Sequence, residues 1–202
     1  RKLDYSIQIS KLFYERFIKN TDITLFSPNH VPGLYEAFGM PEFDSLYLKY
    51  EKDKSIPKST IGAQELFQAL LKERAETGRI YIMNIDHCNT HSSFKDKVYM
   101  SNLCQEITLP TTPIQHIDDK EGEIALCILS AINLGLLTDM NELEELCDLS
   151  VRALDEIIDY QEYPVEAAKI STQARRSLGI GYIGLAHYLA KNQVSYEDKK
   201  AL

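Results

Sequence analysis

The chain has 202 residues, of which 44% are hydrophobic and 26% are charged. This composition supplies a sizeable core and excludes wholesale disorder or a collagen-like fibre. The 30 acidic and 22 basic residues give a net charge of −8, and no Lys/Arg block offers a footprint for nucleic-acid phosphates, so we expect no direct nucleic-acid binding. The longest apolar run, residues 124–129, is far shorter than the roughly 20 residues of a spanning helix, so we expect a soluble chain with no membrane contact.

The first residues and the cysteines indicate the origin and compartment of the chain. It begins Arg-Lys-Leu-Asp, without Met or a signal segment, so we expect an excerpt of a longer protein rather than a secreted precursor. The cysteines form no C-x-x-C pair of the kind found in structural zinc or thioredoxin-type sites. Their spacing fits a reducing compartment, and we expect a cytoplasmic location. They are Cys88, Cys104, Cys127 and Cys147.

The first third of the chain predicts alternating short elements. Apolar residues recur at near-helical spacing over 7–20, and a short strand follows at 22–26. The aromatic-rich stretch 33–53 is broken by glycine and proline, which indicates two short helices or an elaborated loop. Ser59 or Thr60 is placed to cap the next helix.

That helix and the strand after it predict an α/β unit. The helix covers residues 60–77 and ends at Gly78, and a β-rich strand follows at 79–85. A polar segment, 86–97, separates this strand from a second predicted strand at 101–109. The sequence therefore predicts an α/β fold.

The last third predicts a buried strand followed by two helices. After a turn region at 110–122, the nearly apolar stretch 123–132 is typical of a strand buried on both faces, although a buried helix fits the same pattern. Asp139 caps a helix with an apolar stripe, and Pro164 begins another that continues towards Arg175. Glycines interrupt the later part of that helical pattern. No repeat or linker divides the chain, so we expect one domain or a piece of one.

Three side chains of the strand predicted at 101–109 form a candidate reactive surface. Successive residues of a strand alternate between faces, so Asn102, Cys104 and Glu106 project to one side. The nearby Glu106 anion disfavours a thiolate at Cys104, so a neutral thiol or a thiyl radical fits better. The alternative is that Cys104 is a small buried hydrophobic residue with solvated polar neighbours.

The sequence YMSNLCQEITLP at residues 99–110 closely resembles the finger-loop region of class I ribonucleotide reductase large subunits. The likeness extends through residues 71–81, 84–94, 124–135 and 175–181 and so covers nearly the whole chain. The resemblance implies that residues 1–202 are a single segment of the catalytic barrel domain, with a finger loop at about 99–110. This domain is a ten-stranded α/β barrel through whose centre the finger loop passes.

The resemblance also implies the reaction and its residues. A catalytic alpha subunit of this family reduces ribonucleoside diphosphates to 2′-deoxyribonucleoside diphosphates for DNA replication. The cysteine that matches Cys104 becomes a thiyl radical and abstracts the 3′ hydrogen of the ribose. The carboxylate that matches Glu106 takes the 3′-hydroxyl proton as the 2′-hydroxyl departs as water. The amide that matches Asn102 forms hydrogen bonds in the substrate site.

Cys127 matches one member of the family's redox-active cysteine pair, which closes to a disulfide when it reduces the substrate. Its partner lies far upstream in the family, so neither Cys88 nor Cys147 is assigned that role, and Cys147 is expected to pack within its helix. The alternative for Cys127 is a buried core cysteine.

Two further groups of residues are expected to be structural. The segment His87-Cys88-Asn89-Thr90-His91 lacks a visible fourth zinc ligand, so we expect no metal site there but loop capping and packing. We assign Gly179, Gly181 and Gly184 to close backbone packing rather than a phosphate loop. Arg175 and Arg176 are expected on a solvated helix face, with charge balance near a nucleotide as the alternative.

The resemblance places cofactors and partners outside this segment. We expect no cofactor to be bound by it, a radical from the metal cofactor of a separate small (beta) subunit, and ATP or deoxynucleotide effectors at sites elsewhere. Thioredoxin or glutaredoxin is the expected reductant, and the remaining part of the alpha subunit is the expected assembly partner. The isolated chain is therefore expected to be inactive. Alternatives are a related thiyl- or glycyl-radical barrel enzyme, or a reductase-derived assembly module without chemistry.

Overall fold

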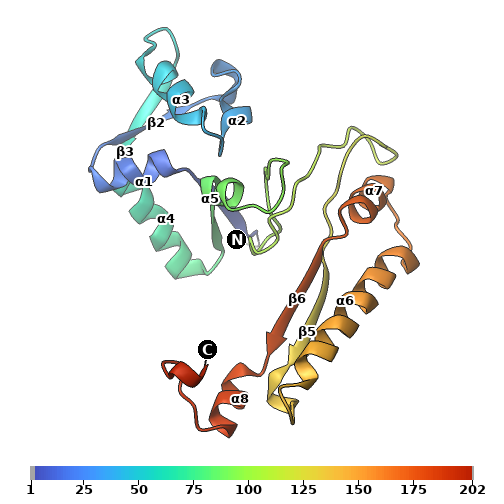
Figure 1. Cartoon of the computed structure of the whole chain (residues 1–202). Helices are drawn as coiled ribbons and strands as arrows, with labels where there is room; N and C mark the ends of the chain where they lie inside the picture. The colour runs from blue at the N-terminus through green and yellow to red at the C-terminus, as the bar shows by residue number, and fades with distance from the viewer. Residues whose placement is uncertain (1–2, 202) are drawn as a thin grey trace. The chain divides into compact units, whose positions relative to one another are not determined.

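The structure is a computed structural model and describes residues 3–201 (Figure 1). The chain divides into two compact units, residues 1–110 and 111–202. Each unit combines helices with short strands, which confirms the α/β class. The named strands of the described residues pair two by two in three small sheets, and no closed barrel is present among them. No helix within residues 3–201 combines the length and the apolar character that crossing a membrane requires.

The strands of the first unit form two pairs. β1 (Tyr5–Ile9) runs parallel to β4 (Ile80–Asn84), with Tyr5 opposite Ile80. β2 (Asp22–Phe26) runs antiparallel to β3 (Lys58–Gly62), with Asp22 opposite Gly62. The helical elements of this unit are α1 (Lys11–Ile18), η1 (Pro28–His30), α2 (Leu34–Ala37), α3 (Phe43–Lys52), α4 (Ala63–Thr77) and α5 (Ile85–Thr90).

Aromatic side chains build the interface between α1 and α4 in the first unit. The ring of Phe67 on α4 lies 6.0 Å from Phe13, 6.1 Å from Tyr14 and 5.1 Å from Phe17, measured between ring centroids. Aromatic pairs at such distances and steep angles add to the stabilisation that burial provides. The i, i+1 and i+4 spacing of the three α1 rings places them on the face of α1 that meets α4.

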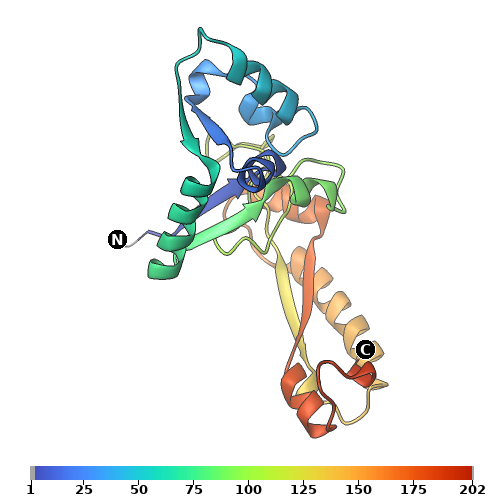
Figure 2. The same ribbon diagram turned by 90° about the vertical axis from the view of Figure 1, so that its left-hand side faces the viewer.

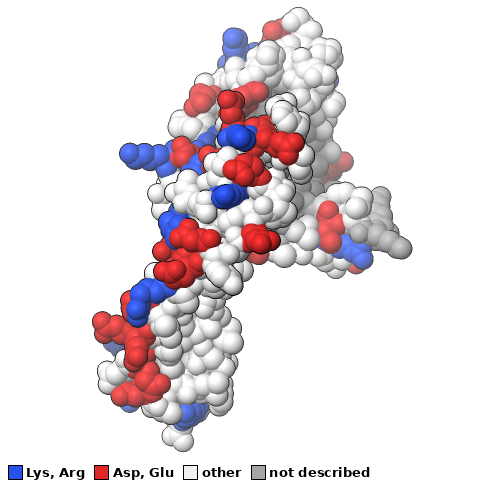
Figure 3. Space-filling model, turned by 90° about the vertical axis from the view of Figure 1, so that its right-hand side faces the viewer, with Lys and Arg blue, Asp and Glu red and all other residues white. Residues whose placement is uncertain are grey.

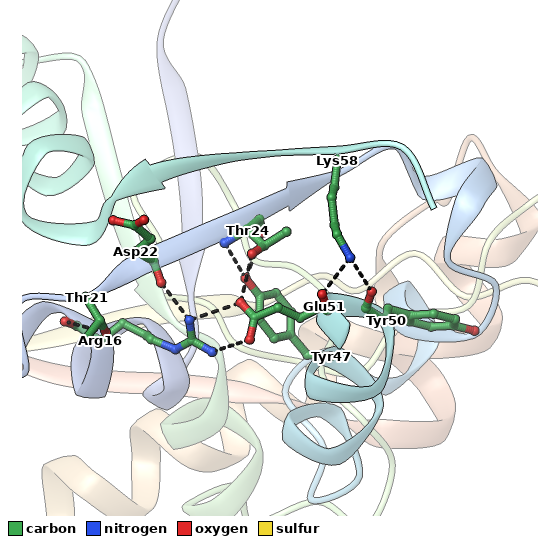
Figure 4. Close-up of polar contacts among 8 residues, drawn as sticks. All are labelled: Arg16, Thr21, Asp22, Thr24, Tyr47, Tyr50, Glu51 and Lys58. Carbon is green, nitrogen blue, oxygen red and sulfur yellow. Dashed lines mark hydrogen bonds and ion pairs between the residues drawn. The ribbon is translucent and has the colours of Figure 1, made fainter. Parts of the chain in front are cut away.

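A polar network ties α1, β2 and α3 together (Figure 4). Arg16 donates two hydrogen bonds to Glu51, and the Thr24 hydroxyl donates a third to the same carboxylate. The Tyr47 hydroxyl lies 2.7 Å from both the backbone N and the backbone O of Thr24. Lys58 donates to carbonyls at the end of α3, where a cation is favoured by the helix dipole.

The second unit contains a parallel pair of strands covered on one face by a long helix. β5 (Ile128–Asn133) pairs with β6 (Leu178–Ile183), Ile128 opposite Leu178. In the view of Figure 2 the two strands lie in front of this helix, α6. Ile132 is buried in a cluster that includes Leu146 of α6. The remaining elements of this unit are α6 (Glu142–Tyr160), α7 (Glu166–Arg175), α8 (Leu185–Lys191), η2 (Leu134–Leu136) and η3 (Lys199–Ala201).

Several predicted elements of the first unit are confirmed. The strand at 22–26, the two short helices within 33–53 and the strand at 79–85 are all present. The helix predicted to end at Gly78 does so, because Gly78 adopts the left-handed conformation (φ 66°) that terminates helices.

Two predictions for the helices of the first unit are wrong. The apolar spacing over 7–20 predicts a helix from Ile7, but Ile7 and Ile9 belong to strand β1. The helix starts only at Lys11, because the Ser10 side chain caps it by accepting the Phe13 N–H. Ser59 and Thr60 lie in β3, where pairing with β2 takes their backbone groups, so neither caps α4.

The second unit corrects the strand predicted at 123–132. Regular pairing begins only at Ile128, and Leu129 is 64% exposed, so this strand is not buried on both faces within the described residues. The turn region and the two helices after it are confirmed. Asp139 accepts the Asn141 N–H just before α6, although the capping position itself is Asn141.

The glycines expected to interrupt a helix lie elsewhere. Helix α7 ends at Arg175 as predicted, but Gly179 and Gly181 belong to strand β6, and Gly184 precedes α8.

On the face drawn in Figure 3, Lys and Arg are interspersed with Asp and Glu.

Candidate functional site

The stretch 101–109, predicted as a strand, is a loop with a tight turn at its centre. The turn is closed by the Gln105 N–H, which donates to the Asn102 carbonyl at 3.1 Å. Gln105 has a φ of 70°, a left-handed conformation that residues other than glycine adopt at a cost. Serine and asparagine side chains that bond to nearby backbone offer an alternative to a strand ladder, which explains the difference.

Side chains hold the two ends of this loop together. The Asn102 Oδ1 accepts the Ile107 N–H at 3.0 Å, and the Ser101 hydroxyl donates to the Ile107 carbonyl at 2.6 Å. The Gln105 side-chain amide donates to the Asn102 carbonyl at 3.1 Å. We call these contacts among Ser101, Asn102, Gln105 and Ile107 the loop clasp. Cys104 lies between these residues in the sequence and is exposed.

The loop changes the geometric basis for the three candidate residues. Asn102, Cys104 and Glu106 are all exposed, and they share one short loop rather than one face of a strand. The argument from alternating strand faces is therefore wrong, although the three residues remain close in the chain. The amide oxygen of Asn102 is engaged in the clasp, which leaves its NH₂ group to act as a donor.

Cys104 also interacts with a residue that the sequence did not single out. Tyr81, on β4, has a raised pKa, first because a neighbouring Cys104 anion disfavours the phenolate and second because the tyrosine forms a hydrogen bond with Cys104. Cys104 therefore lies close enough to Tyr81 on β4 to influence its ionisation. No sequence pattern indicated this contact, because the two residues are 23 positions apart.

Cys127 lies in the second unit, directly before β5, and is half-buried. Burial raises the pKa of its thiol. Its Sγ lies 3.1 Å from where a side-chain Cβ on Gly179 would be, so the glycine permits the sulfur to approach the β6 backbone. A Cβ on Gly184 would likewise clash with Asn133, whereas one on Gly181 would meet open space. The close-packing expectation is confirmed for Gly179 and Gly184 and is wrong for Gly181.

The remaining cysteines and histidines are placed as follows. Cys88 is partly buried, and Cys147 is exposed on α6 rather than packed in it, which corrects that expectation. The rings of His87 and His91 lie edge to face with centroids 5.5 Å apart. Among residues 3–201 no cluster of three or more His, Cys, Asp or Glu side chains could hold a metal ion.

Arg175 and Arg176, at the end of α7, form ion pairs within the second unit. The prediction that they lie on a solvated helix face is therefore wrong. Arg175 pairs with Glu123 at 2.6 Å, and both side chains are largely buried. Arg176 pairs with Asp155 at 2.6 Å and with Asp159 at 3.0 Å. These partners are too distant in sequence for helical spacing to reveal them.

Comparison with known proteins gives a match over the full chain. A family model described as the ribonucleotide reductase barrel domain matches residues 1–202. The ribonucleoside-diphosphate reductase subunit alpha of Buchnera aphidicola subsp. Schizaphis graminum is 57% identical over the whole chain, and the reductase 1 subunit alpha of Escherichia coli is 56% identical. The corresponding subunit of Enterobacteria phage T4 is 43% identical. The chain spans 27% of the length of each of these relatives.

Proposed function

Because the chain belongs to the ribonucleotide reductase barrel-domain family, we propose that it is a segment of the catalytic alpha subunit of a ribonucleoside-diphosphate reductase. The subunit reduces ribonucleoside diphosphates to 2′-deoxyribonucleoside diphosphates for DNA synthesis. The observation that carries this proposal is the likeness, over all 202 residues, to relatives that bear that name.

We propose that residues 1–202 form one segment of a ten-stranded barrel, with the loop at 99–110 as its central finger. The parallel pairs β1–β4 and β5–β6 support this proposal, because parallel sheets normally have both faces covered. Leu129 and Ile183 are exposed on β5 and β6 and would be covered by further barrel strands. A two-stranded parallel pair also leaves its outer backbone edges unpaired, which further strands would pair.

In the proposed mechanism the loop clasp presents Cys104 to the ribose. The Cys104 thiyl radical abstracts the 3′ hydrogen, so its sulfur becomes a thiol and the radical moves to the sugar. Glu106 takes the 3′-hydroxyl proton, and the 2′-hydroxyl leaves as water with a proton from the pair of reducing thiols. The free NH₂ group of Asn102 donates to the substrate. A loop that is held at both ends supports this chemistry, because a reacting atom must be held in place for efficient transfer.

Cys127 is proposed as one of two thiols that supply the two electrons of the reduction. The partial burial of its thiol, which raises the pKa, keeps it protonated near neutral pH. A protonated thiol can supply both hydrogen and electrons when the pair closes to a disulfide. The partner thiol is proposed to come from the remaining part of the alpha subunit.

The proposed partners act on the complete subunit. A separate small subunit would supply the radical from its metal cofactor, and thioredoxin or glutaredoxin would reduce the disulfide again. No cofactor is proposed for this segment, and ATP or deoxynucleotide effectors would bind elsewhere in the subunit. The compartment proposed for the enzyme is the cytoplasm. The chain alone would be inactive.

The test is the formation of deoxycytidine diphosphate from CDP. The complete alpha subunit that contains this segment is combined with its small subunit and dithiothreitol, and reactions that omit either subunit serve as controls. Product that requires both subunits, and that is lost in a Cys127→Ser variant, supports the proposal. No product from the complete system would instead favour an assembly module without chemistry.

A further inference from the structure

A residue to which no catalytic role has been assigned joins the two ends of the loop that carries Cys104. Ser101 lies at one end of this loop and Ile107 at the other, and the Ser101 hydroxyl joins them. We propose that Ser101 is a positioning residue, which sets the location of Cys104 through the loop clasp and does not itself touch the substrate. This inference rests on the proposed function, because it assigns Cys104 the initiating role.

The distances identify the Ile107 carbonyl as the main partner of the Ser101 hydroxyl. The hydroxyl oxygen lies 2.6 Å from this carbonyl and 3.0 Å from the Asn102 Oδ1. A serine hydroxyl has one proton to donate. The Ile107 carbonyl is the closer acceptor, so we assign the proton to it. Ser101 and Asn102 therefore satisfy the carbonyl and the amide of the same residue, Ile107.

This pairing matters because the loop has no sheet to support it. Residues 101–109 form no strand ladder, and the turn at its tip holds Gln105 in a left-handed conformation. The side-chain Oε1 of Gln105 is buried without a hydrogen-bond partner among the described residues. Both features disfavour the turn, so the contacts of Ser101 and Asn102 with Ile107 are needed to hold it.

Ser101 is well placed to do so because it is itself partly buried. A hydrogen bond shielded from water is stronger than an exposed one, and a carbonyl left without its donor bears a desolvation cost. Loss of the hydroxyl would let the Ile107 end of the loop move away from the Asn102 end. Cys104 lies between these ends, so its sulfur would move with them.

The expected consequence is a defect in hydrogen transfer rather than in folding or binding. A displacement of about 1 Å at a reacting atom costs on the order of 100-fold in rate. In the complete enzyme, Ser101→Ala is expected to lower kcat for CDP by about 10- to 100-fold, with a smaller change in KM. Slower hydrogen abstraction would also raise the isotope effect on kcat with 3′-deuterated CDP.

The experiment compares three serine variants of the complete alpha subunit, assayed with the small subunit, CDP and dithiothreitol. Ser101→Ala removes the hydroxyl and Ser101→Thr retains it. Ser92→Ala is the matched control, because the Ser92 Oγ accepts the Phe94 N–H in a different loop of the same unit. We expect a low kcat and a raised isotope effect for Ser101→Ala, recovery in Ser101→Thr, and wild-type values for Ser92→Ala.

The outcomes separate this inference from the proposed function. If Cys104→Ser abolishes turnover while Ser101→Ala keeps the wild-type kcat and isotope effect, the positioning role is wrong and the reductase proposal stands. A low kcat with an unchanged isotope effect would show that hydrogen abstraction is not the slowed step and would also overturn the positioning role. Failure of Ser101→Thr to recover would overturn the assignment to the hydroxyl. If Cys104→Ser retains turnover, the function itself is wrong.

Discussion

Arg16 and Glu51 form a two-point ion pair between helices α1 and α3, with N–H···O distances of 3.0 and 2.6 Å. Only 19% of the Arg16 side chain and 22% of the Glu51 side chain are exposed. The guanidinium and the carboxylate lose much of their hydration here, and the hydrogen bonds between them compensate for that loss. The pair also receives the Thr24 hydroxyl, so it links both helices to strand β2.

We expect Arg16→Met to destabilise the first unit by about 1–3 kcal/mol, because it leaves the Glu51 carboxylate in a largely dry site without its cation. The loss is smaller than for a fully buried pair, since some exposure and the Thr24 hydroxyl remain. The rate of hydrogen exchange of the amides in β2 measures this loss of stability. Lys11→Met removes one of the two exposed lysine partners of Glu15 and is expected to change exchange little. Equal effects of the two substitutions would contradict this account.

The same pair predicts how the first unit responds to acid. Burial acts to raise the pKa of Glu51, but hydrogen bonds from Arg16 and Thr24 outweigh it, and the pKa lies below the ordinary value of 4.5. A carboxyl with a lowered pKa in the folded state stabilises the fold above its ordinary pKa. This stability is lost as the pH falls through the lower folded value.

The loss on acidification is therefore expected below about pH 4.5. Amide exchange in β2, corrected for intrinsic rates, is expected to speed up over this range in the wild-type protein. In Glu51→Gln the neutral side chain does not titrate, so this acid-dependent component is expected to be absent. An identical acid profile for the two proteins would remove Glu51 from the explanation.

Arg176 combines an unfavourable backbone with favourable side-chain contacts. Its φ of 47° lies in the left-handed region at the end of α7, and its guanidinium pairs with Asp155 and Asp159. Arg176→Gly loses the pairs but relieves the backbone, whereas Arg176→Ala loses the pairs and keeps the backbone cost. The glycine variant is therefore expected to have the higher Tm in thermal unfolding. A higher Tm for Arg176→Ala than for Arg176→Gly would show that the left-handed backbone at this position carries no cost.

The contact between Tyr81 and Cys104 is testable through titration of the phenol. Cys104 raises the pKa of Tyr81 above the ordinary value of 10.0 by electrostatics and by a hydrogen bond. Cys104→Ala removes both causes, so the pKa of Tyr81 is expected to fall. Carbon NMR of labelled tyrosine measures the change, with Cys147→Ala as the control. An unmoved Tyr81 pKa would mean that the two side chains do not interact.

The cysteines are expected to differ in their reactivity towards alkylation. Burial raises the pKa of Cys88 and of Cys127, whereas Cys104 and Cys147 are exposed. The thiolate is the reacting form, so burial slows alkylation both by access and by ionisation. With iodoacetamide at pH 8, mass spectrometry of this chain is expected to show Cys104 and Cys147 modified first. Faster modification of Cys127 would contradict its placement beside Gly179.

The elements that could be predicted from the sequence are those determined by local signals. Helix α4 ends at Gly78 because a glycine there accepts a left-handed backbone, and the aromatic stretch 33–53 contains breakers that separate two helices. The helix that follows Asp139 carries a long apolar stripe, which periodicity detects readily.

The errors arose where distant or side-chain contacts decide the structure. Local sequence signals do not predict strand β1, because its pairing partner, β4, lies some 75 residues later. The alternating apolar residues of 101–109 favour a strand, whereas in the structure Ser101 and Asn102 supply hydrogen bonds that a ladder would otherwise provide. Serine and asparagine are common turn formers, so this pair was a signal for a loop.

The choice of candidate site residues depended on resemblance more than on pattern. Spacing alone placed Asn102, Cys104 and Glu106 on one strand face, which the structure does not have. Family likeness selected the same residues independently of that geometry. The contacts of Ser101 and Tyr81 are seen only in the fold, because the family resemblance assigns no chemical role to either residue.

The central claim is that Cys104 initiates reduction of the ribose, and CDP turnover by matched cysteine variants tests it most directly. The complete alpha subunit with its small subunit is compared as wild type, Cys104→Ser and Cys147→Ser, with CDP binding measured in each. We predict that Cys104→Ser binds CDP but forms no deoxycytidine diphosphate, and that Cys147→Ser turns over as the wild type does. Undiminished turnover by Cys104→Ser would contradict the account.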